Sequence, residues 1–299
     1  LFGESHGEGI GAVLDGLSPG IPVDEEYIKL RLSQRRPSGN ISTSRREPDQ
    51  FQILSGVFGG FTTGTPLCIF IPNTNQHSGD YGELSTTARP GHADYTGALR
   101  YKGFNDVRGG GHFSGRLTLP VVAAGVVARK ILADATILDE APCNKVVARI
   151  VELGGIPAPE DASGDVCETA DVCPAWQDAI DEAIAEGDSL GAVIECVVPN
   201  IDPGYGEPFW DSVESVISHA VFAIPGVRGI EFGDGFKAAA MKGSEHNDQI
   251  GEDGRPVKNG AGGVNGGITN GMPIIFRSAV KPTPSIFIEQ DTVDMKEGT

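Results

Sequence analysis

Apolar and polar positions along the chain predict a mixture of strands and helices. Short apolar runs rich in β-branched residues predict strands near 11–16, 52–57, 65–71, 145–153, 190–198 and 273–280. Apolar spacing of three to four residues predicts helices near 24–33, 175–186 and 208–223, the first opening on an acidic cluster and the other two on a proline. These elements favour a single α+β domain over 1–299, with sheets packed on central helices.

The clearest predicted helix covers residues 115–133. It is apolar almost all round, so we expect it to be buried, with Pro120 in its first turn or at a kink. Residues 73–112 just before it show little apolar periodicity and many Gly, Asn, His and Arg residues. A polar stretch of that length is typical of a functional or disordered segment. A second such stretch, 251–271, is rich in Gly and Asn and predicts a loop.

Composition narrows the class of protein. The 299 residues are 39% hydrophobic, enough for a sizeable core, and no apolar run reaches the length of a membrane span. The five cysteines form no CxxC pair and no zinc-finger spacing, which predicts no structural metal and a reduced, cytoplasmic protein. The chain opens inside a motif-like segment without Met and stops in a charged stretch, so we expect residues to be missing at both ends.

Charge is distributed unevenly along the chain. The net charge is −18, yet residues 1–130 hold 13 basic and 12 acidic residues, and the remaining 10 basic and 29 acidic residues lie in 131–299. Locally basic clusters in an acidic protein favour a pocket for a small anion over a nucleic-acid surface, which needs a broad basic stripe.

Two short segments place a histidine among turn residues. In Gly3-Glu-Ser-His-Gly7, flanking glycines expose His6 to a ligand, and an imidazole exchanges protons near neutral pH. In Arg89-Pro-Gly-His-Ala-Asp94, a fixed cation precedes His92, and Asp94 is expected to orient that ring and hold it charged. A surface-loop histidine and a surface ion pair are the alternatives.

Two further segments suit phosphate or a planar ring. Arg108-Gly-Gly-Gly-His-Phe-Ser-Gly-Arg116 puts three glycines before the long helix, where free N–H groups form a natural phosphate cradle, although no P-loop or dinucleotide fingerprint occurs. Ala261–Ile268 and Lys281-Pro-Thr-Pro-Ser285 suit a flavin phosphate or ribityl chain. Arginines at 35, 36, 45 and 46 suit bidentate capture of carboxylate and phosphate. A mobile hinge, an ordinary tight turn and a solvated loop remain the alternatives.

Taken together, these segments resemble the chorismate synthase family from Gly3 to about Thr299. The resemblance depends on ten motifs in the family's order: GESHG, RRP, SRREPDQ, LSGVF with TTGTP, ARPGHADYTG, RGGGHFSGR, EGDSLGA, GIEFGDGF with GSEHND, AGGVNGGITNG and VKPTPSI.

The resemblance implies a reaction. The family converts 5-enolpyruvylshikimate 3-phosphate to chorismate and phosphate by 1,4-anti elimination, a carbon-oxygen lyase step of aromatic amino-acid biosynthesis that needs reduced FMN. It also implies a β-α-β sandwich assembled as a homotetramer. Because the chain has no dinucleotide motif, an external, NADP-linked flavin reductase is the favoured source of reduced flavin.

Residue by residue, the resemblance implies that His6 protonates the departing phosphate and His92 the reduced flavin. Arg35, Arg89 and Arg116 match substrate contacts, with Arg45 a weaker match. Flavin contacts are implied for two sets of residues, which are His112, Phe113 and Ser114, and then Pro225, Gly226, Gly266, Lys281, Pro282, Thr283, Pro284 and Ser285.

Two departures from the family pattern qualify this interpretation. Many members read GGGRSSAR where this chain has GGGHFSGR, so His112 stands in place of an arginine. Members also continue into an Arg-His-Asp-Pro segment that supplies a base, and the sequence given stops before it. A non-catalytic binder of anions or flavin on the same scaffold, and a hydrolase using Ser5 and His6, are the competing hypotheses.

Overall fold

The computed structural model describes residues 1–36, 48–74, 86–134, 146–159, 173–199 and 201–295. Its contacts divide the chain into two compact units, the first unit (1–135 and 287–299) and the second unit (136–286). Both mix helices with antiparallel sheet, so the predicted α+β class is confirmed. That the two units form one domain stays a prediction, because each is described by itself.

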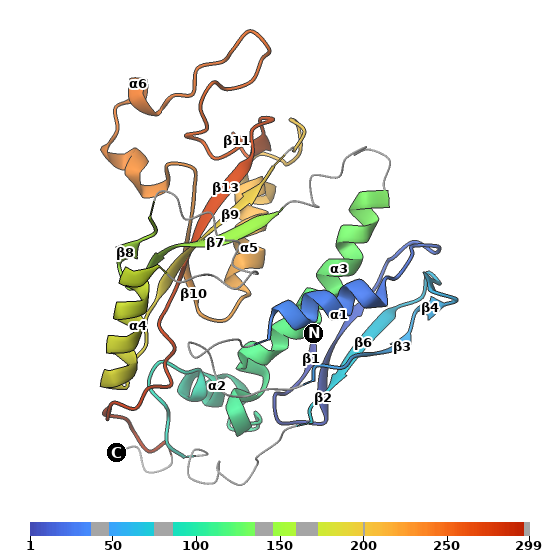
Figure 1. Ribbon diagram of the computed structural model, residues 1–299. Coiled ribbons are helices and arrows are strands. Elements are labelled where there is room, and N and C mark those ends of the chain that lie inside the picture. Colours follow the sequence, from blue (N-terminus) through green and yellow to red (C-terminus); the bar gives the residue numbers. More distant parts are fainter. Residues whose placement is uncertain (37–47, 75–85, 135–145, 160–172, 200, 296–299) are drawn as a thin grey trace. The chain divides into compact units, whose positions relative to one another are not determined.

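The first unit is built on a four-stranded antiparallel sheet in the order β1-β2-β6-β3 (Figure 1). The strands are β1 (Phe2–Gly3), β2 (Gly9–Leu14), β6 (Leu67–Pro72) and β3 (Gln52–Ser55). Alternation in β6 buries Leu67, Ile69 and Ile71, which pair in register with Leu14, Ala12 and Ile10 of β2. One face of the sheet is therefore the apolar floor of this unit.

Two helices cover that floor. Helix α3 (Thr118–Asp134) packs on β2 and β6, and α1 (Glu25–Gln34) packs on α3 (Figure 1). Asp24 caps α1 by accepting the Tyr27 N–H at 2.9 Å, and Ile28 and Leu32 point one turn apart into the core.

The opposite face of the sheet explains two glycines. Phe2 and Phe70 stack with centroids 6.5 Å apart and planes within 3°. A Cβ on Gly11 would lie 2.3 Å from the Phe2 ring, and one on Gly9 2.3 Å from the Phe70 ring. The closely spaced glycines of β2 therefore make room for aromatic rings rather than for a nucleotide.

Shorter elements complete the first unit. A hairpin joins β4 (Val57–Phe58) to β5 (Phe61–Thr62); α2 (Asp94–Tyr101) and the 3₁₀ turns η3 (Arg108–Phe113) and η4 (Gly115–Leu117) lead into α3. The end of the described chain returns to this unit, because Thr87 and Asp294 form an antiparallel bridge and the Ala88 N–H donates to the Val293 carbonyl at 3.3 Å.

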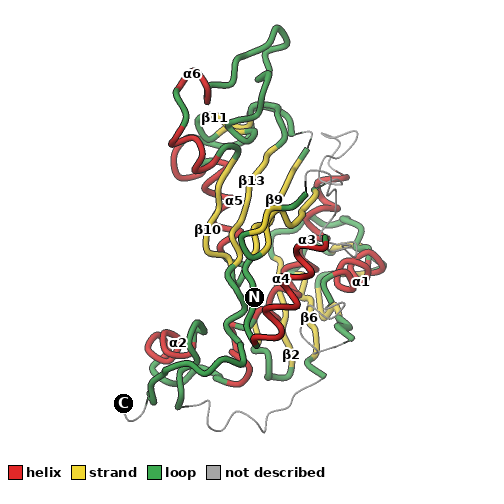
Figure 2. The backbone as a smooth tube through the Cα atoms, turned by 60° about the vertical axis from the view of Figure 1, so that its left-hand side comes forward, coloured by secondary structure: helices red, strands yellow, loops and turns green. Residues whose placement is uncertain are grey.

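The second unit is built on a five-stranded antiparallel sheet in the order β10-β13-β9-β7-β8. Figure 2 shows β10, β13 and β9 side by side. Its strands are β10 (Val227–Phe232), β13 (Ile274–Val280), β9 (Ala192–Val198), β7 (Val147–Leu153) and β8 (Ile156–Pro157). A charged row crosses four of them in register: Arg149, Glu195, Arg277 and Glu231. Glu195, 7% exposed, accepts from both arginines at 2.8 Å, so its buried charge is compensated.

Helices and turns flank this sheet. In α4 (Pro174–Glu186), Trp176 is buried and donates its indole N–H to the Ile156 carbonyl at 3.0 Å, and α5 (Val213–Phe222) packs on β10. The remaining elements are η6 (Phe209–Asp211), η7 (Gly235–Ala240), α6 (Gly243–His246), β11 (Val264–Asn265) and β12 (Ile268–Thr269).

Three sequence expectations need correction. The long helix is not buried all round: Leu119 and Ala123 are fully buried, whereas Val121 and Leu132 on another face are about half exposed. The polar stretch 73–112 contains α2, which a period count missed because only Gly97 of that helix is buried. Strand β10 was not predicted, because its burial is intermediate on both faces and leaves no alternation to detect.

Thiol and membrane features follow from the described residues. Cys68, Cys173 and Cys196 are free thiols. Burial raises the pKa of Cys196 to about 11, with a smaller contribution from the charge of Glu195. This thiol therefore stays protonated at neutral pH. Within the described ranges no helix has the length and apolar character needed to cross a membrane.

Candidate active site

The first histidine segment forms a tight turn at the end of β1. Gly7 N–H donates to the Glu4 carbonyl at 3.1 Å, and the turn buries both Ser5 (0% exposed) and His6 (4%). The surface-loop alternative for His6 is therefore wrong. A histidine buried to this extent at a polar turn has its ring held by defined partners.

Asn73 links this turn to the cation cluster, and sequence reasoning missed it. Its side-chain amide donates to the Glu4 carbonyl at 2.9 Å and to the Gly7 carbonyl at 2.8 Å, while its Oδ1 accepts from Arg116 Nε at 2.7 Å. Asn73 directly follows β6, and a polar residue just past a buried strand is the signal that could have found it.

Arg116 lies at the centre of the cation cluster. Its side chain is 10% exposed, and Nη1 contacts Asp49 Oδ1 at 3.1 Å. Asp49 is itself 7% exposed and also faces Arg36 Nε at 3.6 Å. An unpaired buried guanidinium costs free energy, so the ion pair with Asp49 compensates the buried charge of Arg116. Asp49 belongs to the SRREPDQ motif but was not predicted as a site residue.

Arg35 lies beside this cluster as the C-cap residue directly after α1. Its Nε donates to Thr118 Oγ1 and its Nη2 to the Gly115 carbonyl, both at 3.1 Å. Burial lowers the pKa of Arg35 from its ordinary value, the charge of Arg116 lowers it further, and Asp49 opposes both. Arg45 lies outside the described residues. Asn73 thus links the turn that holds His6 to Arg116, and Asp49 pairs with Arg116 and acts on Arg35 through its charge.

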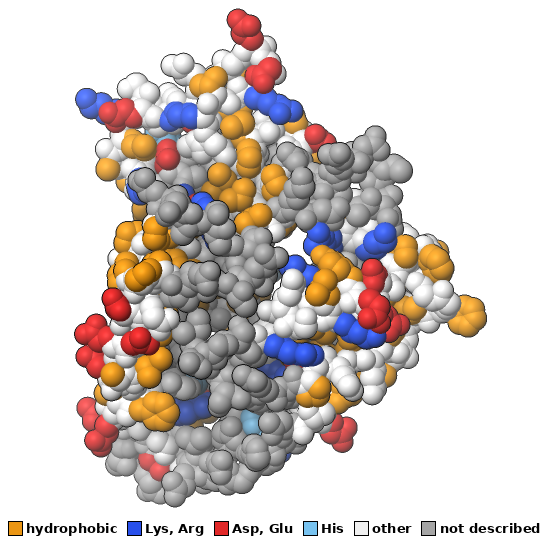
Figure 3. All heavy atoms as spheres, viewed as in Figure 1, with side chains coloured by type: hydrophobic (Ala, Val, Ile, Leu, Met, Phe, Trp, Pro, Cys, Tyr) orange, Lys and Arg blue, Asp and Glu red, His pale blue; other side chains and the backbone are white. Residues whose placement is uncertain are grey.

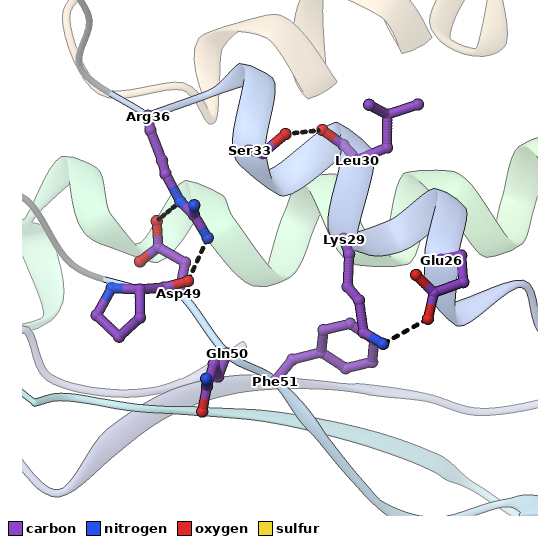
Figure 4. A pocket seen from close by; sticks show the side chains of 9 residues that line it. Glu26, Lys29, Leu30, Ser33, Arg36, Asp49, Gln50 and Phe51 are labelled. Atoms are coloured by element: carbon purple, nitrogen blue, oxygen red, sulfur yellow. Dashed lines mark hydrogen bonds and ion pairs between the residues drawn. The ribbon is translucent and has the colours of Figure 1, made fainter.

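A pocket of about 760 Å³ opens beside this cluster (Figure 4). It lies between α1 and the segment 48–51, with the Arg36–Asp49 pair at one end and the Lys29–Glu26 pair, 2.6 Å apart, at the other. Its lining includes Asp49 but neither His6 nor Arg116, so Asp49 separates the pocket from the buried cluster. On the face that Figure 3 displays, basic and acidic side chains are intermixed.

A second group of interacting side chains is centred on Asp94. Its contacts correct the expectation that Asp94 orients the His92 ring. Arg89 forms a two-pronged pair with Asp94, Nε to Oδ2 at 2.8 Å and Nη2 to Oδ1 at 2.9 Å. His92 Nδ1 instead lies 3.1 Å from the Pro90 carbonyl. Burial would raise the pKa of Asp94, but the hydrogen bonds from Arg89 outweigh it and the pKa is lowered. Asp94 therefore holds Arg89 as its main partner, and its effect on His92 is electrostatic.

The residues matched to flavin contacts fall in both units. In the first, His112 Nδ1 donates to the Gly3 carbonyl at 2.8 Å, Phe113 packs on Tyr101 with centroids 6.1 Å apart, and the Ser114 hydroxyl accepts the Arg116 N–H at 3.3 Å.

In the second unit, the Lys281 N–H donates to the Gly226 carbonyl at 2.9 Å, which places Pro225–Gly226 beside Lys281. The Thr283 carbonyl accepts from the Ser189 hydroxyl at 2.7 Å, which anchors the 281–285 loop, and Thr283 and Ser285 are exposed. Gly266 lies at the tip of the β11–β12 hairpin. A lysine, hydroxyls and a glycine with open space around it fit a phosphate and a ribityl chain.

Comparisons with known proteins identify the family of this chain. The chorismate synthase family model matches residues 1–299. A chorismate synthase of Chitinophaga pinensis is 48% identical over 299 residues, covering 100% of this chain and 82% of the relative. One of Pyrococcus abyssi is 45% identical, covering 99% and 84%. A crystal structure of chorismate synthase superposes with a TM-score of 0.71 at 31% identity, covering 95% of this chain and 83% of that one. With a family model over its whole length and relatives this similar, the chain belongs to the chorismate synthase family.

Proposed function

We propose that the protein converts 5-enolpyruvylshikimate 3-phosphate to chorismate and phosphate by 1,4-anti elimination, with reduced FMN as cofactor. The observation that carries the proposal is one buried network in which Asn73 connects the turn of His6 to Arg116, and Asp49 connects Arg116 to the pocket end of α1. A proton donor and fixed cations held together suit the departure of a phosphate.

In this proposal the arginines bind the anionic substrate. Arg116 and Arg35 supply permanent charge, and Arg89 presents a guanidinium whose orientation Asp94 fixes. Arg45 is a further proposed contact. His6 delivers a proton to the leaving phosphate and His92 holds one for the flavin, each by the Nε2 atom, because Nδ1 of each ring faces a polar neighbour.

The described residues fit the cofactor. The proposed contacts are His112, Phe113 and Ser114 in the first unit, and Pro225, Gly226, Gly266 and Lys281 to Ser285 in the second unit. When bound, reduced FMN supplies electron density to the substrate and recovers it, so there is no net redox change. An external NADP-linked reductase, a homotetrameric assembly and a cytoplasmic location belong to the same proposal.

The hydrolase alternative is disfavoured by the surroundings of Ser5. Its side chain is fully buried, and its hydroxyl lies 3.0 Å from the Gly109 carbonyl, to which it donates. A hydroxyl that is buried and bonded to a backbone carbonyl is not presented to a substrate as a nucleophile.

The test is anaerobic turnover by the full-length protein, following chorismate and phosphate with chemically reduced FMN, with oxidised FMN and without flavin. We expect products only with reduced FMN, and a higher thermal midpoint when FMN is bound. Phosphate release without flavin would favour the hydrolase, and flavin binding without turnover would favour the non-catalytic binder.

A further inference from the structure

The Ser5 hydroxyl has more partners than it has hydrogens. Its Oγ lies 3.0 Å from the Gly109 carbonyl, 3.4 Å from the Arg108 carbonyl and 3.2 Å from His6 Nδ1. Carbonyl oxygens only accept, so the single hydroxyl hydrogen goes to a carbonyl, and the shorter contact favours Gly109. The hydroxyl then accepts from His6, which requires the proton on Nδ1.

This arrangement decides the tautomer of neutral His6. With Nδ1 carrying the hydrogen, Nε2 is the atom that gains and releases a proton. The tautomer therefore depends on where the carbonyls of residues 108 and 109 point.

One carboxylate fixes those carbonyls. Asp106 Oδ1 accepts from the Arg108 backbone N–H at 3.0 Å and from Arg108 Nε at 2.9 Å, and Oδ2 accepts from Nη2 at 2.7 Å. Three bonds from one residue to one carboxylate hold both the backbone and the side chain of Arg108. The loop closes tightly behind them, since a Cβ on Gly111 would lie 2.0 Å from the Asp106 carbonyl and one on Gly109 2.0 Å from the His6 ring.

The charges around Asp106 also favour the ionised carboxylate that holds Arg108. The hydrogen bonds from Arg108 lower the pKa of Asp106 against the effect of burial, and the charge of His6 adds to the lowering. Asp106 thus stays ionised beside His6. The charge of Glu4 also acts on Arg108 and raises its pKa, as Asp106 does.

We propose that Asp106 is a positioning residue that, through Arg108 and the 108–111 loop, sets the tautomer and orientation of His6. The inference rests on the proposed function only for the role of His6 as proton donor. Asp106 would touch neither substrate nor flavin, and it would act through the carbonyls that hold Ser5.

A purely structural role makes a different forecast. The side chains of Asp106 and Arg108 are 21% and 43% exposed. Ion pairs at such positions contribute little to stability, so a structural role predicts a small loss of stability and no change at the imidazole.

The experiment uses Asp106→Asn in the full-length protein. Its amide nitrogen would meet Arg108 Nη2 donor to donor, which breaks one prong of the pair without changing the shape of the side chain. Asp181→Asn is the matched control, because Asp181 accepts a side-chain bond from Gln177 at 2.8 Å on the exposed face of α4. If Asp106→Asn does not fold, Arg108→Lys carries the same test, since it keeps the charge and loses the fork.

The decisive readout is independent of turnover. In protein with ¹⁵N-labelled histidine, at a pH above which the His6 signals no longer change, we expect His6 to show a protonated Nδ1 in the wild type and in Asp181→Asn, and a shift toward protonated Nε2 in Asp106→Asn. The His6 signals are assigned from their loss in a His6 variant. Identical His6 signals in the wild type and in folded Asp106→Asn overturn the proposal.

Kinetics give the second readout. We expect kcat of Asp106→Asn to fall about 10- to 100-fold while KM changes less than about threefold, because orientation is lost and binding is not. A 10- to 100-fold rise in KM with unchanged kcat would also overturn the proposal. If no variant and no wild type turns over, the proposed function fails, yet the tautomer measurement still decides the role of Asp106.

Discussion

Gly109 and Gly110 are neighbours with the same backbone requirement and different surroundings. Both have positive φ, 58° and 84°. A Cβ on Gly109 would lie 2.0 Å from His6 Cε1 and 2.1 Å from Nδ1, whereas the nearest atom to a Cβ on Gly110 is Ser114 Cβ at 3.9 Å. Gly110→Ala therefore measures backbone strain alone, and Gly109→Ala adds a collision with the imidazole.

The magnitudes follow from these distances. A left-handed non-glycine residue costs about 1–2 kcal/mol, which is the whole expected loss of unfolding free energy in Gly110→Ala. Overpacking a filled site adds about 1–3 kcal/mol, so Gly109→Ala should lose about 2–5 kcal/mol unless His6 moves away. If His6 does move, its acid catalysis is lost, and that is worth about 100-fold or more in turnover.

The assay pairs urea denaturation of both variants with turnover on reduced flavin. We expect Gly109→Ala to be the less stable variant, the less active one, or both. Equal stability and equal turnover in the two variants would show that the imidazole does not fill the space beside Gly109, and the placement of His6 would be wrong.

Three further predictions follow from the same site. His6→Ala and His92→Ala should each slow turnover by about 100-fold or more, measured by chorismate absorbance, and near-normal rates in both would contradict their roles as proton donors. Asn73→Asp removes the two donors to the Glu4 and Gly7 carbonyls, so it should lower the urea-derived free energy of unfolding by about 1–3 kcal/mol, and an unchanged midpoint would refute the link. Because the pKa of Asp94 lies below its ordinary value of 3.8, the ionised carboxylate stabilises the fold above that pH and this contribution is lost as the pH falls through the lowered pKa. The stability difference between wild type and Asp94→Asn should thus be constant near neutral pH and shrink in acid; a difference that grows in acid would reverse the sign.

Local pattern determined most of the secondary structure. Strands β2, β6, β7, β9 and β13 and helices α1 and α4 lie close to their predicted ranges, because alternation, caps and prolines act within a few residues. Helix α5 begins at Val213, where Ser212 caps it, and not at the predicted Pro208. Helix α2 and strand β10 escaped prediction because only Gly97 of α2 is buried and the burial of β10 does not alternate along the strand. Their own sequences carry no strong period.

The candidate site residues also divide into what the sequence determined and what the tertiary structure decided. Residue types and motif order by themselves identified His6, His92 and the arginines as candidates, because an imidazole or a guanidinium keeps its chemistry in any fold. The tertiary structure alone decided the distant partners: Asn73 joins residues 4 and 116, and the Ser5 hydroxyl contacts the carbonyls of residues 108 and 109. Hydrogen bonds form between atoms within about 3 Å, and only the folded path of the chain brings residues a hundred positions apart to that distance.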